Sequence, residues 1–469
     1  MDCMEKKELA YKRAYVWDKL NADERKDVME MGEDYKAFLN EGKTERRCAA
    51  EIIRRAEAAG FECICSKSSL KAGDKVYYNN RGKAVMLAII GEEPIENGMN
   101  IVGSHIDSPR LDIKQNPVYE AGGTVLLKTH YYGGIKKYQW TALPLAIYGV
   151  IVKANGEKVE IAVGDGADDP VFYITDLLPH LAKDQMSKNL AEGIEGENLN
   201  VLTGSLPVDD TEASDRFKTA LLNILNERYG IEEEDFVSAE LEAVPAGKAR
   251  DVGFDRGLIA AHGHDDRVCS YASLAAMLKV EKPARTAVGL YVDKEEIGSV
   301  GATGMHSQFF INMVGEIIAL MNGRNCPDLA IRRALAHSTL LSADVAAAFD
   351  PNYPSVGDNA NFAGIGQGIA MVKYTGSRGK SGANDASAEL VGKVRKLFND
   401  HNVLYQTSEL GKVDQGGGGT IAYILANNDM DVIDAGVAML SMHAPWEIVS
   451  KADVYMTNRA YYEFLVNYR

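Results

Sequence analysis

The chain has 469 residues, of which 46% are hydrophobic and 25% are charged, and its 51 Lys and Arg against 67 Asp and Glu give a net charge of −16. This is the composition of a globular protein, and the acidic balance argues against binding to nucleic acid or to anionic membranes, which requires a basic surface. The length predicts two domains, or one large domain with an insertion. Six cysteines in a chain of this length do not make a disulfide framework.

The N-terminal sequence bears on location. Residues 1–8 are polar and lack the apolar segment of a signal peptide. No apolar run in the sequence reaches the roughly 20 residues that are needed to span a bilayer. We therefore expect a cytoplasmic protein that has neither membrane nor nucleic-acid partners.

The first part of the chain, residues 1–115, has the pattern of an α/β domain. Residues 5–60 are charged, alanine-rich and amphipathic, which predicts helix. Residues 70–91 predict a hairpin whose second arm is a buried strand. A further buried strand at 99–103 is followed at once by Ser-His-Ile-Asp-Ser-Pro at 104–109.

The pattern changes in the middle of the chain and then returns. Short alternating runs, split by Gly and Asn turns, predict a β-rich inserted domain at 116–245 that contains one clear helix at 215–229. From 246 to 469 strands alternate with helices again. The expected helices are at 270–280, 306–322, 326–337, 384–400, 419–427 and 447–467, and the expected strands are at 286–292, 339–347, 369–374, 402–408 and 431–439. The predicted fold class is α/β, a central and mostly parallel sheet with helices on both faces, interrupted by the inserted domain.

The most informative stretch is the end of the predicted strand at 286–292. Its apolar run stops at an aspartate, and Glu295 and Glu296 follow just before Gly298. In open α/β sheets, ligands bind at the carboxyl ends of the strands. One of two neighbouring acids can hold a metal ion there while the other accepts a proton from water. A bare Glu-Glu pair is more often solvated surface, so the choice depends on four further clusters.

Two of these clusters contain adjacent polar groups at the end of a strand or the start of a helix. His105 and Asp107 follow a buried strand and share a face if the chain is extended, so Asp107 can accept the second ring N–H of His105 and fix the tautomer that binds metal. The alternative is a surface histidine in a turn. Asp265 and Asp266 precede an apolar helix, where a carboxylate can bridge two metal ions or simply cap the helix. The sequence leaves open which of the two acids binds.

The other two clusters lie in the last third of the chain. Asp344 lies within an apolar stretch, where an unpaired carboxylate is costly, so its partner is either a cation or a buried arginine. His443 follows the last predicted strand and is either a ligand or a core histidine. Taken together, the clusters suit paired Zn²⁺, Mn²⁺ or Co²⁺ ions. Four glycines at 416–419, Gly418 among them, either let backbone N–H groups approach a ligand closely or form a plain flexible loop.

These motifs resemble those of the M18 family of metallo-aminopeptidases, the aspartyl-aminopeptidase family, and most of all its bacterial branch. The resembling segments follow the family's order between residues 103 and 448. They are GSHIDSPRLDIK, LLPHLAKDQ, HDDRVCS, DKEEIGS, LSADVAAAFDPNY, and GGGGTIAYILA with LSMHAPWEI. The resemblance implies a catalytic domain of the zinc-exopeptidase type at 1–115 and 246–469, a dimerisation domain at 116–245, and assembly into a tetrahedral homododecamer.

The resemblance also implies a role for each motif residue. In the family, two divalent metal ions share one bridging aspartate, and zinc is the ion that we expect first. The ligands correspond here to His105, Asp265 and Asp344 for one ion and to Asp265, Glu296 and His443 for the other. Glu295 would be the general base, and Asp107 would orient His105. The protein would then be an aminopeptidase that removes N-terminal residues from peptides.

Two expectations concern substrate and assembly. The residues alone favour a structural role for His180, whereas the resemblance implies that it reaches across a dimer into the neighbouring active site. Lys373, with Arg378 and Lys380, lies in a segment that borders the family's specificity pocket, and it favours an acidic or polar N-terminal residue. The alternative is a solvated basic loop. Residues 374–380 also depart from the asparagine-rich sequence that the family usually has at this place. The chain also has His264 before the two acids where the family often has Asp-Asn after a leucine.

Two other functions compete with an aminopeptidase. A deacylase or another dinuclear amide hydrolase could use the same scaffold. A peptide-binding or assembly protein without activity could also retain it, although such a protein has no need of the base Glu295.

Overall fold

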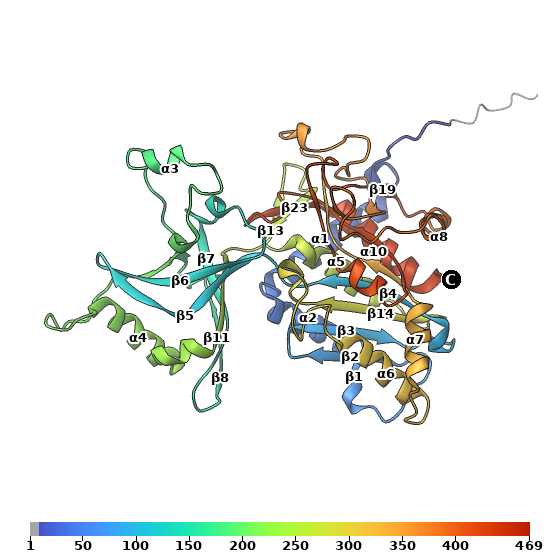
Figure 1. Cartoon of the computed structure of the whole chain (residues 1–469), viewed down its shortest axis with the longest axis horizontal. Helices are drawn as coiled ribbons and strands as arrows, with labels where there is room; N and C mark the ends of the chain where they lie inside the picture. The colour runs from blue at the N-terminus through green and yellow to red at the C-terminus, as the bar shows by residue number, and fades with distance from the viewer. Residues whose placement is uncertain (1–8) are drawn as a thin grey trace, which may run out of the picture.

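The computed structural model describes residues 9–469. Most of its strands belong to two large sheets that lie side by side (Figure 1). The larger sheet has nine strands, and its order places strands from the two ends of the chain next to one another. In that order the strands are β1 (Glu62–Cys63), β2 (Lys75–Asn80), β3 (Ala84–Ile89), β14 (Thr286–Val292), β4 (Met99–His105), β15 (Thr339–Ser342), β21 (Asp431–Gly436), β17 (Ile369–Val372) and β19 (Tyr405–Thr407).

The centre of this sheet is parallel. Strands β14, β4, β15 and β21 run in the same direction, whereas β2, β3 and β17 introduce antiparallel neighbours. The sheet is therefore mixed, with a parallel core. Because the carboxyl ends of parallel strands meet at one edge, the residues that follow β14, β4 and β15 are brought together there.

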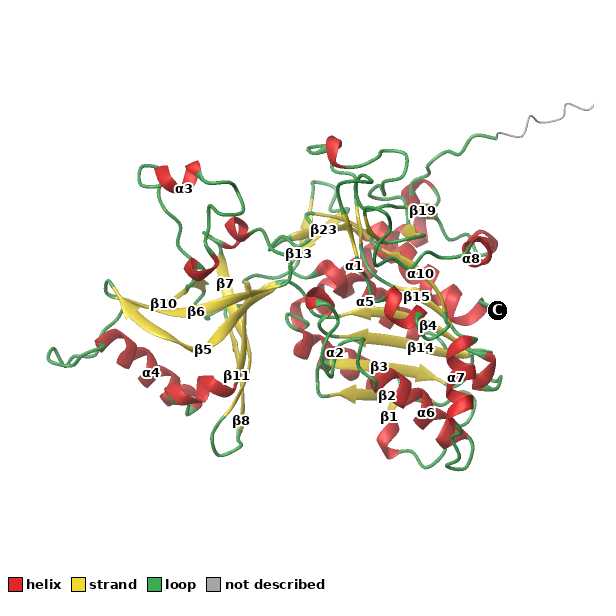
Figure 2. Cartoon of the chain, viewed as in Figure 1, coloured by secondary structure: helices red, strands yellow, loops and turns green. Residues whose placement is uncertain are grey.

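Helices cover both faces of the sheet, which explains why the central strands β14, β4 and β15 are buried along their whole length (Figure 2). Alternate residues of one strand enter different cores: Val85 and Leu87 of β3 pack in one, and Met86 and Ala88 in the other. The first core includes residues of α1 (Ala22–Glu41), α2 (Glu45–Ala58), α5 (His264–Met277), α8 (Ala388–Asp400) and α10 (Lys451–Asn467). The second includes residues of α6 (Phe309–Met321), α7 (Asp328–Ala336) and α9 (Ala422–Ala426).

The second large sheet has seven strands and its own apolar core. In sheet order they are β11 (Ala239–Pro245), β5 (Arg110–Ala121), β6 (Thr124–Tyr132), β10 (Val201–Gly204), β9 (Phe172–Tyr173), β7 (Pro144–Val152) and β8 (Lys158–Val163). β11 also pairs with β7, so the sheet closes on itself. Two helices accompany it, α3 (Lys183–Ser187) and α4 (Arg216–Tyr229). The division of the chain at 115 and 245 stays a prediction.

A smaller sheet lies beside the parallel core. It consists of β12 (Arg250–Val252), β13 (Leu258–Ala261), β23 (Glu447–Ser450), β22 (Ala438–Leu440) and β16 (Ala346–Ala347). Two short strands, β18 (Gly376–Ser377) and β20 (Gly417–Gly418), pair separately.

Several predicted elements differ from the observed ones. The predicted strands at 339–347 and 431–439 are each interrupted, because the chain passes from the nine-stranded sheet to the smaller one between β15 and β16 and between β21 and β22. Asp344 lies in the first of these crossings and not within a strand. The described part of the predicted helical stretch 5–60 contains a 3₁₀ turn at Val16–Asp18 and two α-helices, the second of which begins where Thr44 accepts a hydrogen bond from Arg47 N. Residues 5–8 of that stretch, and the polar segment 1–8, lie outside the described residues.

Two further structural facts concern the whole described chain. Within residues 9–469, no helix combines the length and the apolar character that crossing a membrane requires. The five cysteines in this part of the chain are all free.

Candidate active site

The predicted residues gather where β4 and β14 end. His105 is the last residue of β4 and lies beside Val292, the last residue of β14, in the parallel register. Glu295 and Glu296 follow β14 in a 3₁₀ turn, between Lys294 and Gly298, which both have a left-handed backbone with φ 66° and 93°. The chain therefore reverses directly after the strand, and both carboxylates stay at the sheet edge.

His105 is buried, and both of its ring nitrogens have carboxylate neighbours. Its Nδ1 lies 3.3 Å from Asp107 Oδ1, and its Nε2 lies 3.1 Å from Asp265 Oδ1. The expected contact between Asp107 and His105 is thus present. Asp107 also accepts hydrogen bonds from the backbone N–H groups of Glu295 (3.1 Å) and Glu296 (3.3 Å), so one carboxylate holds the histidine and the glutamate turn together.

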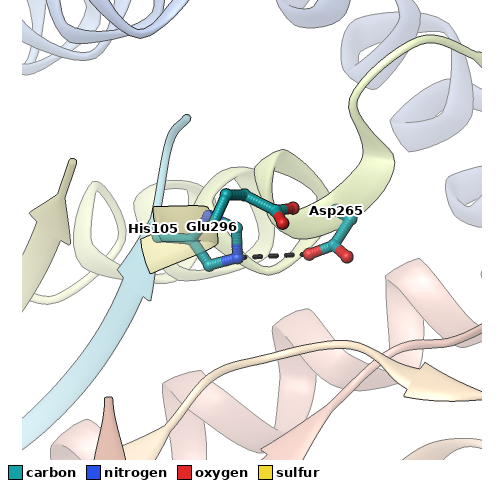
Figure 3. A group of neighbouring side chains, drawn as sticks. All are labelled: His105, Asp265 and Glu296. Atoms are coloured by element: carbon teal, nitrogen blue, oxygen red, sulfur yellow. Dashed lines mark hydrogen bonds and ion pairs between the residues drawn. The ribbon is translucent and has the colours of Figure 1, made fainter. Parts of the chain in front are cut away.

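Asp265 lies between two histidines. Its Oδ1 faces His105, and its Oδ2 lies 3.2 Å from Nε2 of His443. The same nitrogen of His443 lies 3.6 Å from Glu296 Oε2. Figure 3 shows the carboxylate of Glu296 pointing toward Asp265, whose side chain a dashed line joins to the ring of His105. The ligand atoms of His105, Asp265 and Glu296 all lie within 4.8 Å of one another, a separation that one metal ion can bridge.

Asp266 and Asp344 form a second group with His105, and its ligand atoms also lie within 4.8 Å of one another. The side chain of Asp266 is completely buried, and its Oδ2 accepts a hydrogen bond of 3.4 Å from the backbone N–H of His105. The two adjacent acids therefore occupy different positions, because Asp265 faces both histidines whereas Asp266 lies behind His105.

The electrostatics of the group favour a bound cation. Burial raises the pKa of Glu296 and of Asp266, and the neighbouring carboxylates Asp265 and Asp344, respectively, raise them further. Burial likewise raises the pKa of Asp344. Within residues 9–469, Glu296 Oε1 and Asp266 Oδ1 are buried without a hydrogen-bond partner. Unpaired buried oxygens are costly, so this donor set fits divalent metal ions, which prefer imidazole and carboxylate ligands here.

Glu295, unlike Glu296, belongs to neither group of candidate ligand atoms. Burial, together with the charges of Asp265 and Asp107, raises the pKa of Glu295 to about 7. A carboxyl group with a pKa near neutral pH can both accept and return a proton, which is the property that a general base requires.

Glu447 was missed by the sequence analysis. This buried carboxylate in β23 accepts hydrogen bonds from the backbone N–H groups of His443 (2.7 Å) and Asp265 (3.1 Å), and so it joins two of the predicted ligands. Burial, and then the charge of Asp265, raises its pKa to about 8. The only sequence feature that points to Glu447 is its position four residues after His443. That spacing indicates a contact only if the chain turns back between the two residues.

A cavity of about 680 Å³ opens next to these side chains. Glu295, Glu296 and His443 lie on one side of it, and the glycine loop, including Gly418, lies on another. Gly417 and Gly418 form β20, with Gly416 before it and Gly419 after it. The helix begins only at Ala422, so the predicted helix start at 419 was wrong.

Two predicted residues lie away from this cavity. Lys373 does not line it, and its Nζ lies 2.6 Å from Asp385 Oδ1; Arg378 and Lys380 of the same segment are lining residues. Lys380 also pairs with Asp385, at 3.0 Å. His180 is exposed on the loop before α3, and Figure 1 shows α3 well apart from the nine-stranded sheet. The cavity of its own chain does not include His180.

Buried imidazole and carboxylate groups at the carboxyl edge of a parallel sheet, next to a cavity, define a metal-dependent hydrolase. Residues 38–465 match the family described as Aminopeptidase I zinc metalloprotease (M18). A probable M18 family aminopeptidase 1 from Clostridium acetobutylicum is 54% identical, over 97% of this chain and 98% of the relative.

Solved structures agree with this match. The aminopeptidase of the M18 family from Thermotoga maritima superposes with a TM-score of 0.94 at 44% identity, covering 97% of this chain and 100% of that one. Aminopeptidase I from Clostridium acetobutylicum superposes with a TM-score of 0.92 at 51% identity, covering 98% and 100%. The chain belongs to the M18 family of zinc metallo-aminopeptidases and is a metal-dependent exopeptidase.

Proposed function

We propose that this aminopeptidase uses two metal ions and removes single N-terminal residues from peptides, with a preference for acidic or polar ones. The observation that carries the dinuclear proposal is the position of Asp265, whose two carboxylate oxygens face two different histidines at 3.1 and 3.2 Å. A carboxylate that offers one oxygen to each of two sites is suited to bridge two ions.

The donor set divides between the two sites around Asp265. We assign His105 and Asp344 to one site and Glu296 and His443 to the other. Ligand atoms of His105 lie within 4.8 Å of those of both Asp344 and Glu296, so the two proposed sites adjoin. Divalent ions held there, Zn²⁺ first with Mn²⁺ or Co²⁺ as alternatives, supply Lewis-acid polarisation of the scissile carbonyl and a more acidic water. Asp107 fixes the Nδ1 tautomer of His105, so that Nε2 stays free to bind metal.

Glu295 is the general base in this proposal. Its carboxylate accepts a proton from the attacking water and returns it to the amine that leaves when the peptide bond breaks. Its backbone N–H donates to Asp107, which keeps the side chain at the cavity wall. The carboxylates of the cavity also give a free α-ammonium group favourable electrostatic surroundings, which supports exopeptidase rather than endopeptidase action.

The substrate preference rests on Arg378 and Lys380, which line the same cavity as Asp265, Glu296 and His443. A cationic side chain there can pair with an acidic substrate side chain. Lys373 contributes indirectly, because it shares Asp385 with Lys380. We expect aspartyl p-nitroanilide to be cleaved faster than the leucyl compound, and Arg378→Ala to reduce that ratio. Equal cleavage of both compounds by the wild type, unchanged by Arg378→Ala and Lys373→Ala, would exclude the preference.

Oligomerisation is proposed to complete the site. His180 lies beside exposed apolar side chains, Leu177, Leu178 and Leu181, which are 53%, 50% and 68% exposed. Such a surface favours contact with a second copy of the chain, and His180 can then donate a hydrogen bond to the substrate carbonyl there, which is worth about 3 kcal/mol in comparable sites. A yeast aminopeptidase structure with this fold, at 22% identity, is described as a dodecamer.

Subunit mixing tests the role of His180. The His180→Ala and Glu295→Gln proteins should each be weakly active, and co-assembled mixtures should recover activity because some sites then combine both intact residues. Mixed assemblies, verified by native mass spectrometry, that stay inactive would mean that His180 acts within its own chain or has no catalytic role.

The function itself is tested by metal content and substrate blocking. Metal removal with phenanthroline should abolish activity, and titration with Zn²⁺, Mn²⁺ or Co²⁺ should restore it as two ions bind per chain. Unblocked aminoacyl p-nitroanilides should be cleaved, whereas their N-acetylated counterparts should not. A protein that is fully active without metal, or that prefers the acetylated substrates, would overturn the proposal.

A further inference from the structure

The turn at residues 132–134 connects the seven-stranded sheet to the metal-binding residues. It follows the hairpin of β5 and β6, which starts three residues after Asp107 and reverses at glycines 122 and 123. In the antiparallel register, Arg110 at the start of β5 pairs with Tyr132 at the end of β6. Because a hairpin returns the chain to its starting point, the end of β6 lies next to Asp107.

Three consecutive residues of this turn contact three different groups of the site. The Tyr132 hydroxyl donates to Asp107 Oδ2 at 2.8 Å. Gly133 packs against Glu296, since a Cβ placed on it would lie 3.2 Å from Glu296 Oε2. The Gly134 carbonyl lies 2.8 Å from Nδ1 of His443 and accepts its N–H when Nε2 is free to bind metal.

Tyr132 is itself held in place. Its ring is buried, and the guanidinium of Arg110 lies 3.7 Å from the ring centroid. Arg110 in turn is buried between carboxylates, at 3.4 Å from Glu242 and 3.5 Å from Glu45. A ring fixed in this way has little freedom, so its hydroxyl is directed at Asp107 before any metal binds.

Asp107 transmits the effect to the ligands. Its carboxylate accepts a hydrogen bond from the Tyr132 hydroxyl and faces Nδ1 of His105. The same carboxylate accepts hydrogen bonds from the backbone N–H groups of Glu295 and Glu296. We propose that Tyr132 is a positioning residue for the metal ligands, and that the 132–134 turn makes metal affinity depend on the seven-stranded sheet. The proposal rests on the ligand set proposed above. It gives that sheet a role in the active site of its own chain, in addition to any contact with other subunits.

The first test removes one oxygen atom. Tyr132→Phe should weaken metal affinity by about 10-fold, measured by competition with a chromophoric chelator, since partners of metal ligands typically contribute 10- to 100-fold. Tyr131→Phe is the matched control, because Tyr131 is the neighbouring residue of β6 and its side chain is 43% exposed. Thermal unfolding of the metal-free proteins measures separately the stability lost with the buried hydrogen bond, and affinities are compared at a temperature at which both variants are folded. On an Asp107→Asn background, Tyr132→Phe should cause no further loss of affinity.

A second pair of variants tests the turn through its backbone. Gly133 and Gly122 both have a left-handed backbone, with φ 74° and 59°, but nothing lies within 4 Å of a Cβ at Gly122. Alanine therefore introduces comparable backbone strain at both positions, and only Gly133→Ala also contacts Glu296. Gly133→Ala should lower metal affinity several-fold more than Gly122→Ala.

The results separate this inference from the proposed function. If His105→Ala abolishes tight metal binding while Tyr132→Phe and Gly133→Ala bind as their controls do, the ligand set stands and the inference is wrong. If His105→Ala leaves metal binding unchanged, both fail.

Discussion

Glu447→Gln tests how far the metal site depends on a residue that binds no metal. The two carboxylate oxygens of Glu447 accept hydrogen bonds from the backbone of His443 at 2.7 Å and of Asp265 at 3.1 Å. A glutamine has the same shape but only one acceptor oxygen, so its NH₂ group must face one of the two N–H donors.

The expected magnitude follows from that one lost acceptor. A buried N–H group without a partner costs about 1–3 kcal/mol, which corresponds to about 5- to 150-fold in an equilibrium constant. Both donors belong to residues that we propose as ligands, so a shift of either backbone also displaces a ligand side chain. We expect metal affinity to fall by about 10-fold, as is typical when a partner that orients a metal ligand is lost, in addition to a loss of stability in the metal-free protein.

Chelator competition measures the affinity, and thermal unfolding of the metal-free protein measures the fold. Glu281→Gln, at an exposed position after α5, controls for the loss of one charge. Unchanged metal affinity would refute the reasoning. A loss confined to the stability of the metal-free protein would refute it as well, because Glu447 would then hold the fold together without organising the ligands.

Two further predictions concern the glutamate turn and the response to pH. Glu295→Gln should keep both metal ions and lose about 10²- to 10⁴-fold in kcat, whereas Glu296→Gln should lose metal from one site; the opposite pattern in metal content and rate would exchange the two roles. Burial, and then the charge of Arg267, lowers the pKa of His262 well below its usual value. Below pH 6.5, His262 is therefore protonated in the unfolded chain but stays neutral in the folded one. The stability that His262 contributes is present above pH 6.5 and is lost as the pH falls. For metal-loaded protein, His262→Gln should reduce the dependence of unfolding free energy on pH between 6.5 and 5, by an amount that rises to about 1.4 kcal/mol per pH unit near pH 5, and an unchanged dependence in denaturant titrations would contradict this.

The sequence by itself determined the framework of the site. Apolar runs that end in polar residues predicted β4 and β14, and the predicted strand at 286–292 coincides with β14. The rule that ligands bind at the carboxyl ends of strands then grouped the clusters that contain His105 and Glu296 into one predicted metal site. Such patterns are local, because burial on both faces of a strand leaves its mark in consecutive residues.

Only the tertiary structure decided which groups hold these residues in place. Tyr132 and Glu447 are far from Asp107 and Asp265 in sequence, and the hydrogen bonds between them form only once the fold brings these residues together. The same holds for Lys373, whose partner Asp385 depends on how its loop closes. Asp344 lies between strands because the chain passes from one sheet to another there. This crossing depends on how whole elements pack and not on the residues next to Asp344. Hydrophobic periodicity specifies elements, whereas contacts between polar side chains depend on how those elements assemble.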